Sequence, residues 1–280
     1  MDAIGVSSLA NNLISHDGTR WMGNECILNS NADVGMLIDT SRCTLGLPSN
    51  HGNRVLVIGN SYSAAFVPAF EQLSTDTNTV FTVTSSWGAS PIDTILNSSA
   101  WSAANDYYWS ELLPNLISGL ISGDAVFITS DLSQLLPSAM DQEAMRRIEV
   151  FRSGLSDFSS KLSKRGISLF ILGPLPFARE AMCSPSMATP QWFTPNGAPC
   201  IYYTRAETEH RQSPVRRVLA ELESVSLLTV VNLDSIFCPT DVCTYHGTDG
   251  IILYRDVYSH PSAEAARLSA GPMHEQLSLP

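Results

Sequence analysis

Short runs of aliphatic and β-branched residues alternate along this chain with longer segments whose apolar positions repeat at helical spacing. The short runs predict five strands, at residues 54–58, 79–84, 124–129, 167–172 and 227–232. Helical patterns lie between them, at residues 107–122, 140–165 and 207–225. This alternation is typical of a mainly parallel sheet with helices on both faces. We therefore predict an α/β fold built as a three-layer α/β/α sandwich.

The domain organisation follows from where this rhythm begins. Residues 1–50 lack it, so we expect an irregular N-terminal extension over 1–50 and one α/β domain over 51–280. Residues 181–201 contain four prolines and Trp192, which indicates a long insertion. It is a candidate lining for the acceptor side of a cleft. Trp192 would then stack on a sugar ring or, as is commoner, pack beneath its own loop.

The turn after the first predicted strand carries a serine that is a candidate nucleophile. Residues 54–58 stop at Gly59 and Asn60, and an apolar-periodic helix begins near Ser61. A strand that turns sharply into a helix places helix N-terminal amides behind the turn residue, and such amides stabilise negative charge. A serine there can attack a carbonyl while backbone N–H groups hold the oxyanion. The alternative is that Ser61 only caps the helix.

A second candidate group lies near the end of the chain. An apolar run at 251–253 predicts a strand, and the loop after it carries Asp256 and His260, with Ser262 as the expected N-cap of a final helix. Neutral imidazole is the natural base for a serine hydroxyl, and a nearby carboxylate fixes its tautomer and stabilises the imidazolium. The alternative is a solvent-facing loop histidine. Because Ser61 and Asp256 both follow predicted strands, we expect them at the same sheet edge.

Three sequence blocks together resemble the SGNH hydrolases, most closely the SGNH domain at the C-terminus of membrane acyltransferase-3 proteins. The blocks are Val57-Ile58-Gly59-Asn60-Ser61, then Phe237-Cys238-Pro239 with Cys243, and Leu253-Tyr254-Arg255-Asp256 with His260. They span most of the chain from residue 54 onward. The resemblance implies a flavodoxin-like α/β/α sandwich. It also implies ester chemistry, with Ser61 as nucleophile, His260 as base and Asp256 as acid.

The resemblance implies an oxyanion hole as well, made in the family by the nucleophile's own amide, a glycine amide and an asparagine side chain. The amides of Ser61 and Gly88 are the candidates here, because Gly88 follows the strand at 79–84 and glycine lets a backbone N–H approach a ligand closely. The alternative is that Gly88 is an ordinary turn glycine. No asparagine follows the strand at 124–129, and an ionised Asp131 there would repel an oxyanion. The acyltransferase-linked branch often lacks this asparagine.

Two details depart from the family pattern. Asn60 replaces the usual aspartate before the nucleophile, a position that the serine's chemistry does not require. Three residues separate Asp256 from His260 where the family has two, and Pro261 follows the base where leucine is usual. One extra loop residue is either absorbed by a bulge or displaces the acid. We expect displacement, so that Asp256 contributes less than usual and Asp256→Asn keeps measurable turnover.

The six cysteines fall in three close pairs, and we predict that each pair forms a disulfide. The pairs are Cys26–Cys43, Cys183–Cys200 and Cys238–Cys243. Six cysteines allow 15 connectivities, and sequential pairing is the economical one because both partners share one irregular segment. The resemblance supports the last pair. Zinc binding competes, although no pair has C-x₂-C spacing and His246 near Cys243 is a lone histidine.

Composition narrows the compartment and the partners. Disulfides require an oxidising compartment, so we expect the extracellular, periplasmic or secretory-lumen side. The net charge of -11, with Lys161 and Lys164 as the only lysines, argues against binding to nucleic acid or an anionic membrane. The residues from Met1 to Gly5 do not fit the pattern of a secretory signal, and no apolar run approaches the length of a membrane span. We expect either an excised lumenal or extracellular domain or a natural fragment with its membrane part encoded upstream.

These features predict a serine-dependent O-acyl ester enzyme that acts on a carbohydrate or glycolipid, without metal or other cofactor. Its expected partners are an acyl donor, a glycan or glycolipid acceptor, and a membrane acyltransferase domain that delivers the acyl group. Water as acceptor makes the protein an esterase, and a sugar hydroxyl makes it an O-acyltransferase. The alternative is a catalytically degenerate SGNH module that serves as a lumenal binding or interaction domain. The distance between Ser61 and His260 discriminates between the two.

Overall fold

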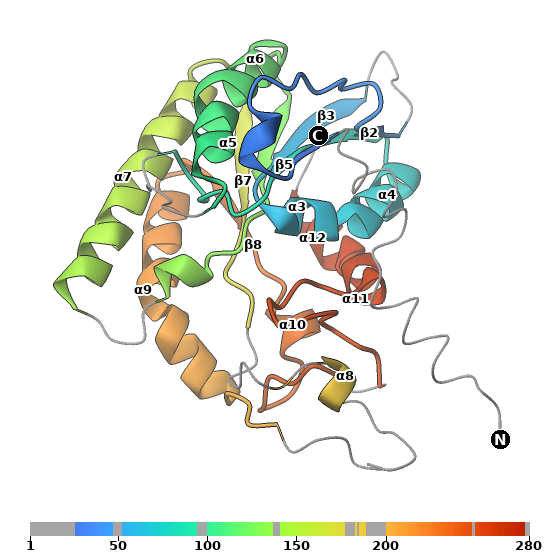
Figure 1. The fold of residues 1–280 in the computed structure, drawn as a ribbon, viewed down its shortest axis with the longest axis vertical. Coiled ribbons are helices and arrows are strands. Elements are labelled where there is room, and N and C mark those ends of the chain that lie inside the picture. Colours follow the sequence, from blue (N-terminus) through green and yellow to red (C-terminus); the bar gives the residue numbers. More distant parts are fainter. Residues whose placement is uncertain are drawn as a thin grey trace.

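A central sheet lies between two layers of helices in the computed structural model of the chain (Figure 1). The structure describes residues 26–46, 52–93, 100–136, 141–176, 183, 185–188, 200–247 and 250–277. Six strands form the main sheet in the order β2-β4-β3-β6-β7-β8, and β1 and β5 form a separate parallel pair. All neighbours in the main sheet are parallel except β2, which runs antiparallel to β4. The predicted α/β sandwich with a mainly parallel sheet is therefore confirmed.

The strands are short, and the central ones are buried throughout. Their bounds are β1 Ile27–Leu28, β2 Thr44–Leu45, β3 Asn53–Ile58, β4 Thr79–Val83, β5 Ser85–Ser86, β6 Ala125–Ile128, β7 Ser168–Leu172 and β8 Thr229–Val231. Every residue of β6 is buried, as are the last four residues of β3 and of β7. Strands covered on both faces read as continuous apolar runs, which is why the sequence located them.

The helices cover both faces of this sheet. Their bounds are α3 Ser61–Ala65, α4 Val67–Asp76, α5 Ser102–Tyr107, α6 Leu113–Ser118, α7 Gln142–Ser163, α8 Pro185–Ala188, α9 Arg205–Ser224, α10 Asp234–Phe237, α11 Ala263–Leu268 and α12 Ala270–Leu277. Short 3₁₀ helices occupy Asn31–Asp33 and Ser133–Leu135, and a π-helix occupies Tyr108–Leu112. Helices α5, α6, α7 and α9 cover one face, and α4, α11 and α12 cover the other (Figure 1).

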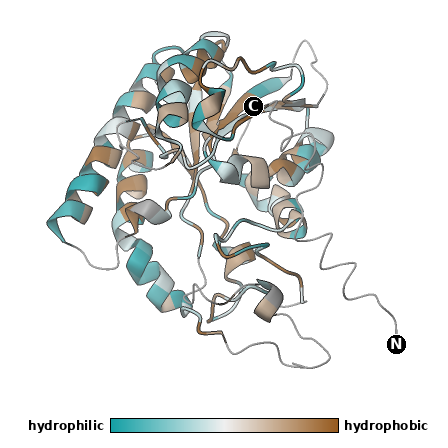
Figure 2. Cartoon of the chain, viewed as in Figure 1, coloured by the Kyte–Doolittle hydropathy of each residue, from teal (hydrophilic) through white to brown (hydrophobic). Residues whose placement is uncertain are grey.

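The amphipathic character of the outer helices explains how they pack. Helix α7 begins at the N-cap Asp141, whose side chain accepts a hydrogen bond from the Ala144 amide. It buries Ile148, Phe151 and Leu155 against the sheet, and its outer surface is hydrophilic (Figure 2). The brown strands at the centre of Figure 2 are the apolar layer that these helices enclose.

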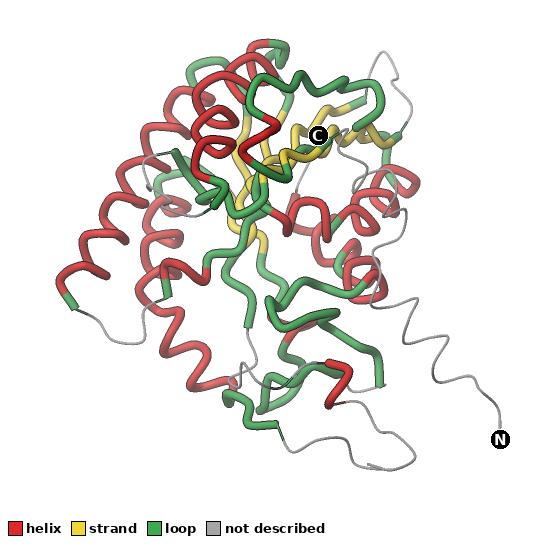
Figure 3. Tube along the Cα trace, viewed as in Figure 1, coloured by secondary structure: helices red, strands yellow, loops and turns green. Residues whose placement is uncertain are grey.

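Two predicted elements are corrected. The apolar run at 251–253 is no strand, because Ile252 and Tyr254 make only isolated bridges, with His246 and Pro261. The helix predicted at 107–122 starts earlier, at Ser102, and ends at Ser118, with the π-helical turn inside it. The described residues on either side of α10 are mostly loop (Figure 3). Trp192, predicted to lie in the insertion, falls outside the described residues.

The described part of the predicted extension 1–50 contributes strands. Within residues 26–46, β1 pairs with β5 and β2 adds an antiparallel edge to the main sheet. Cys26 and Cys43 are joined by a disulfide and are fully buried. This part of the chain therefore packs on the α/β core, while the proposed boundary at residue 50 stays a prediction.

Candidate active site

The turn between β3 and α3 presents Ser61 at the carboxyl edge of the sheet. Gly59 has φ 151°, and a Cβ there would lie 2.2 Å from the Thr129 carbonyl oxygen, so the turn requires glycine. Asn60, not Ser61, is the N-cap of α3, and its side chain accepts a hydrogen bond from the Tyr62 amide at 3.1 Å. The capping alternative for Ser61 is therefore wrong, and its hydroxyl is available for another partner.

That partner is His260. The Ser61 Oγ lies 2.6 Å from the His260 Nε2, and the His260 Nδ1 lies 2.7 Å from the Asp256 Oδ2. The three side chains form one hydrogen-bonded row, although 199 positions separate serine from histidine. A base that holds the serine hydroxyl, and is itself oriented by a carboxylate, is the arrangement that activates a serine nucleophile.

The expectation that the extra loop residue displaces Asp256 is corrected by this geometry. Ser259 adopts the left-handed conformation, with φ 60°, and its amide donates to the Asp256 carbonyl at 3.2 Å, so that residues 256–259 form a turn. The Asp256 Oδ1 accepts hydrogen bonds from the Tyr258 amide at 3.0 Å and the His260 amide at 3.2 Å. One carboxylate oxygen thus closes the turn while the other faces the imidazole.

The electrostatic surroundings keep Asp256 ionised. Burial raises the pKa of its carboxyl group, but the hydrogen bond and the charge of His260 lower the pKa by more. Arg255 acts in the same direction, with its Nε 3.6 Å from the Asp256 Oδ2. The net effect is a pKa below the ordinary aspartate value, so the group is a carboxylate at neutral pH.

The segment after His260 is fixed to the rest of the domain. Tyr254 and Pro261 form an isolated antiparallel bridge, and the Ser262 amide donates to the Leu253 carbonyl at 2.9 Å. Ser262 caps α11 by accepting from the Ala265 amide, as the sequence predicts. The base is therefore held between a closed turn and a capped helix.

A cavity of about 530 Å³ opens beside the serine and the histidine. Its lining residues are Ile27, Asn60, Ser61, Tyr62, Ala64, Trp87, Gly88, Trp101, Asp131, Arg255, Asp256, Tyr258 and His260. The walls are largely apolar and aromatic, with a few polar groups near the nucleophile. That combination is typical of small-molecule sites, which measure about 300–1,000 Å³.

Gly88, the candidate oxyanion glycine, lines the same cavity as Ser61. It has φ 66°, and a Cβ there would lie 2.8 Å from the Trp101 ring. Both its backbone conformation and its contact with Trp101 therefore favour glycine. The Trp101 indole donates to the Asn29 carbonyl at 2.9 Å, which places the ring beneath the disulfide-linked segment.

Asn60 is a functional residue that sequence reasoning missed. Its Oδ1 accepts from the Asp131 amide at 3.1 Å as well as from the Tyr62 amide, and its Nδ2 donates to the Ala89 carbonyl at 3.4 Å. One side chain thereby ties together the three loops that surround Ser61. Its N-cap preference was the available signal.

Asp131 follows β6 and lines the same cavity as Ser61. Burial raises the pKa of its carboxyl group, although the Ser133 hydroxyl and amide that donate to it lower that pKa. The Ser133 amide lies 2.8 Å from the Asp131 Oδ1. The Ser133 amide and hydroxyl, at the start of the 3₁₀ helix, donate to the two carboxylate oxygens. The Asp131 carboxylate is thus held in place as part of the cavity lining.

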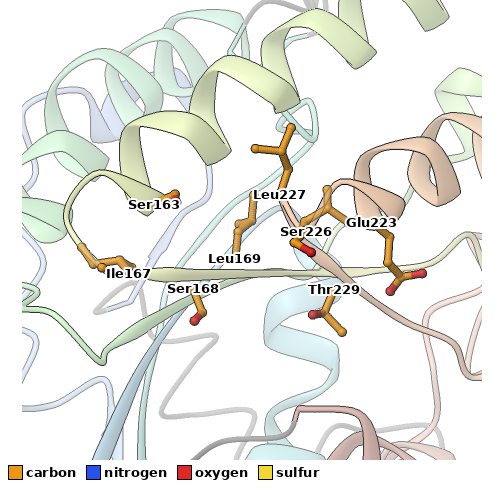
Figure 4. Close-up of a pocket in the computed structure, with 10 residues that line it drawn as sticks. Ser163, Ile167, Ser168, Leu169, Glu223, Ser226, Leu227 and Thr229 are labelled. Atoms are coloured by element: carbon orange, nitrogen blue, oxygen red, sulfur yellow. The ribbon is translucent and has the colours of Figure 1, made fainter.

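A second cavity, of about 410 Å³, lies at the opposite edge of the sheet (Figure 4). Ser168 and Thr229 begin β7 and β8 and line it, together with Glu223, whose Oε1 accepts from the Val230 amide at 2.8 Å. No histidine lines this cavity. It lacks a base for its serines, and the first cavity is therefore the candidate active site.

The cysteines are joined in three sequential pairs, Cys26–Cys43, Cys183–Cys200 and Cys238–Cys243. In the described ranges, no three His, Cys, Asp or Glu side chains are grouped to hold a metal ion. Among the helices that the structure describes, none is long and apolar enough to cross a membrane.

A turn after a central parallel strand thus places Ser61 beside a histidine from the C-terminal end of the chain, within a mainly parallel α/β fold. The sequence matches the family described as SGNH domain (fused to AT3 domains) over residues 25–275, and the chain belongs to that family.

Solved structures resemble the chain at low sequence identity. The periplasmic domain of the Salmonella ser. Paratyphi A lipopolysaccharide acetyltransferase is 13% identical, covers 98% of both chains and superposes with a TM-score of 0.63. A catalytic mutant of an acetylxylan esterase from Geobacillus stearothermophilus is 10% identical, with coverage of 84% of this chain and 98% of the esterase and a TM-score of 0.48. No curated protein sequence matches the chain.

Proposed function

We propose that this domain is a serine-dependent O-acyl ester enzyme that acts on a carbohydrate or glycolipid outside the cytoplasm. The observation that carries the proposal is the row of hydrogen bonds from the Ser61 Oγ through His260 to Asp256, at 2.6 and 2.7 Å, at the wall of an apolar cavity. The short Ser61–His260 distance favours an enzyme over a degenerate binding module, for which the two side chains need not meet.

In this mechanism, the Ser61 Oγ attacks the carbonyl carbon of an acyl ester while the His260 Nε2 takes the hydroxyl proton. Asp256 holds the Nδ1 proton and stabilises the imidazolium. The amides of Ser61 and Gly88 hold the tetrahedral oxyanion, a contribution of about 2.7–4 kcal/mol per donor in other enzymes. His260 then protonates the leaving alcohol, and the acyl group remains on Ser61 as an ester.

A second alcohol or water completes the reaction. His260 removes a proton from the acceptor, which attacks the acyl-serine and releases Ser61. Membership of a family fused to AT3 domains supports a sugar hydroxyl as acceptor and a membrane acyltransferase domain as the source of the acyl group. The three disulfides support an oxidising compartment on the extracellular or periplasmic side. Trp87 and Trp101 in the cavity offer apolar faces to an acyl group or a sugar ring.

The test is turnover of p-nitrophenyl acetate by the wild type and by Ser61→Ala, with and without an added sugar acceptor. We expect the alanine variant to lose turnover with a nearly unchanged thermal midpoint, because Ser61 is partly exposed and its removal leaves no core cavity. A serine-reactive phosphonate should label Ser61 alone. Full activity in Ser61→Ala, or labelling of another serine, would refute the proposal.

A further inference from the structure

The loop that carries the acid and the base is under conformational strain. Ser259 has φ 60°, one of two positive-φ residues other than glycine among the described residues. A serine in this left-handed region is less stable than in the common regions, so its surroundings must hold it there. The neighbouring Val257 and Tyr258 are 45% and 73% exposed, and the Tyr258 side chain lines the cavity with its ring centroid 6.2 Å from that of His260. Neither side chain is buried in the core, so the hydrogen bonds of the loop backbone are important for its conformation.

Tyr62 donates to this backbone from the helix that bears the nucleophile. Its hydroxyl lies 2.9 Å from the Tyr258 carbonyl oxygen and 2.9 Å from the Ser259 carbonyl oxygen. A phenol has one proton, which is shared between the two acceptors in a three-centre bond. Tyr62 is 2% exposed, and its ring lies 5.1 Å from the His260 ring. Tyr62, which follows Ser61 in the chain, is thus hydrogen-bonded to the turn that precedes His260.

We propose that Tyr62 is a positioning residue, whose hydroxyl holds the carbonyls of Tyr258 and Ser259 and so keeps Asp256 and His260 aligned with Ser61. The inference rests on the proposed ester chemistry for its kinetic consequences. It explains how this chain tolerates three residues between acid and base.

The physical consequence of losing the hydroxyl follows from the turn's geometry. Two carbonyls would lose their donor, and the buried Ser259 carbonyl would be left without a hydrogen bond, which destabilises the turn. Ser259 could then leave the left-handed region and lengthen the path between Asp256 and His260. Burial raises the pKa of Tyr62 well above its usual value, so the phenol stays a donor across the working pH range.

The first test compares Tyr62→Phe with Tyr245→Phe. Tyr245 is equally buried and donates to the Cys183 carbonyl at 2.7 Å, but it does not line the cavity. We expect Tyr62→Phe to lower kcat about tenfold with little change in KM, and Tyr245→Phe to affect only the thermal midpoint. Equal kcat values in Tyr62→Phe and the wild type would overturn the inference.

A double-mutant cycle separates positioning from a merely structural role. If Tyr62 acts by aligning Asp256, then Asp256→Asn should cost much less kcat in the Tyr62→Phe background than in the wild type. Ser259→Gly should partly restore kcat to Tyr62→Phe, because glycine adopts φ 60° without strain. Fully additive losses and no rescue by glycine would show that Tyr62 does not act through this turn.

A spectroscopic readout tests the inference without any substrate. The proton between the His260 Nδ1 and Asp256 gives a downfield imidazole resonance in ¹H NMR spectra, and Asp256→Asn identifies it by abolishing it. We expect Tyr62→Phe to weaken or remove this resonance, and Tyr245→Phe to leave it unchanged. If the wild type shows the resonance but turns over no ester, the proposed function fails and the inference survives. An unchanged resonance in Tyr62→Phe would refute the inference.

Discussion

At the scale of single residues, the contact between His260 and Asp256 decides how much the acid contributes. The 2.7 Å distance from the His260 Nδ1 to the Asp256 Oδ2 is short enough for a charge-assisted hydrogen bond. A carboxylate in this place fixes the imidazole tautomer that can accept the serine proton. The expectation that Asp256 contributes little and that Asp256→Asn keeps measurable turnover is therefore replaced by the prediction of a large loss.

We predict that Asp256→Asn lowers kcat by a factor on the order of 10³–10⁴, the scale seen when a triad acid is replaced. His260→Ala and Ser61→Ala should match each other and lose more, on the order of 10⁶, because the nucleophile and its base act as one unit. Steady-state hydrolysis of a chromogenic acetate measures all three. Asp76→Asn, at an exposed position on α4, is the matched control. Turnover near the wild-type value in Asp256→Asn would show that His260 needs no acid.

The same carboxylate gives the fold a pH dependence in the acid range. The pKa of Asp256 is lowered in the folded protein, so the unfolded chain binds more protons between the ordinary value of about 4 and the folded value. This stabilising contribution is complete above the unfolded pKa and is lost as the pH falls through the folded pKa. Urea unfolding at several pH values in that range measures the free energy of unfolding of the wild type and of Asp256→Asn. We expect this free energy to fall less steeply with decreasing pH in the variant. The same pH dependence of the unfolding free energy in both proteins would contradict a lowered pKa of Asp256 in the fold.

Local patterns singled out Ser61 and His260, whose side chains lie 2.6 Å apart, but not the way they are aligned. Ser61 lies on a strand-to-helix turn, and His260 precedes a capped helix, so short-range signals were sufficient. The turn at Ser259 accepts a hydrogen bond from Tyr62, which is 197 positions away in sequence. No local pattern carries that information. A departure in spacing therefore does not reveal by itself whether the loop absorbs it.

At the scale of elements, the segment 26–46 supports the wall of the cavity that contains Gly88. The Trp87 amide donates to the Leu28 carbonyl at 2.9 Å, and β1 pairs in register with Ser85 and Ser86 of β5. Ile27 itself lines the cavity. The Cys26–Cys43 disulfide joins the residue before β1 to the residue before β2. The hydrophobic rhythm could not predict this contact, because β1 and β2 are only two residues long.

We predict that Cys26→Ser/Cys43→Ser lowers both stability and turnover. A crosslink of this loop length stabilises by about 3 kcal/mol in the chain-entropy account, and its loss also loosens the support of the Gly88 loop. Cys238→Ser/Cys243→Ser is the control, with a loss of about 2 kcal/mol for its shorter loop and no contact with the cavity. Thermal unfolding and turnover below the melting transition measure the two effects. Equal activity in both double variants would show that β1 does not support the site.

At the scale of the whole molecule, the chemistry of the cavity differs from the charge of the chain. The cavity is lined largely by apolar and aromatic side chains, whereas the chain as a whole carries a net charge of -11. An apolar cavity suits an acyl group. A strongly acidic surface is repelled by anionic lipid headgroups, and the repulsion weakens as salt screens it. Under the proposed function, these two features favour an acyl group presented by a membrane partner over one extracted from an anionic bilayer.

We predict that the isolated domain does not sediment with vesicles that contain anionic lipid, at low or at physiological ionic strength. Proteins that adsorb to such vesicles present clusters of Lys and Arg, and each cationic side chain near the surface contributes about 1 kcal/mol. This chain has 27 acidic residues against 16 Lys and Arg, with only two lysines. Neutral vesicles serve as the control, since they test apolar adsorption alone. Binding that requires anionic lipid and falls with salt would reveal a basic face that the net charge conceals. It would also remove the need for a membrane partner to present the acyl group.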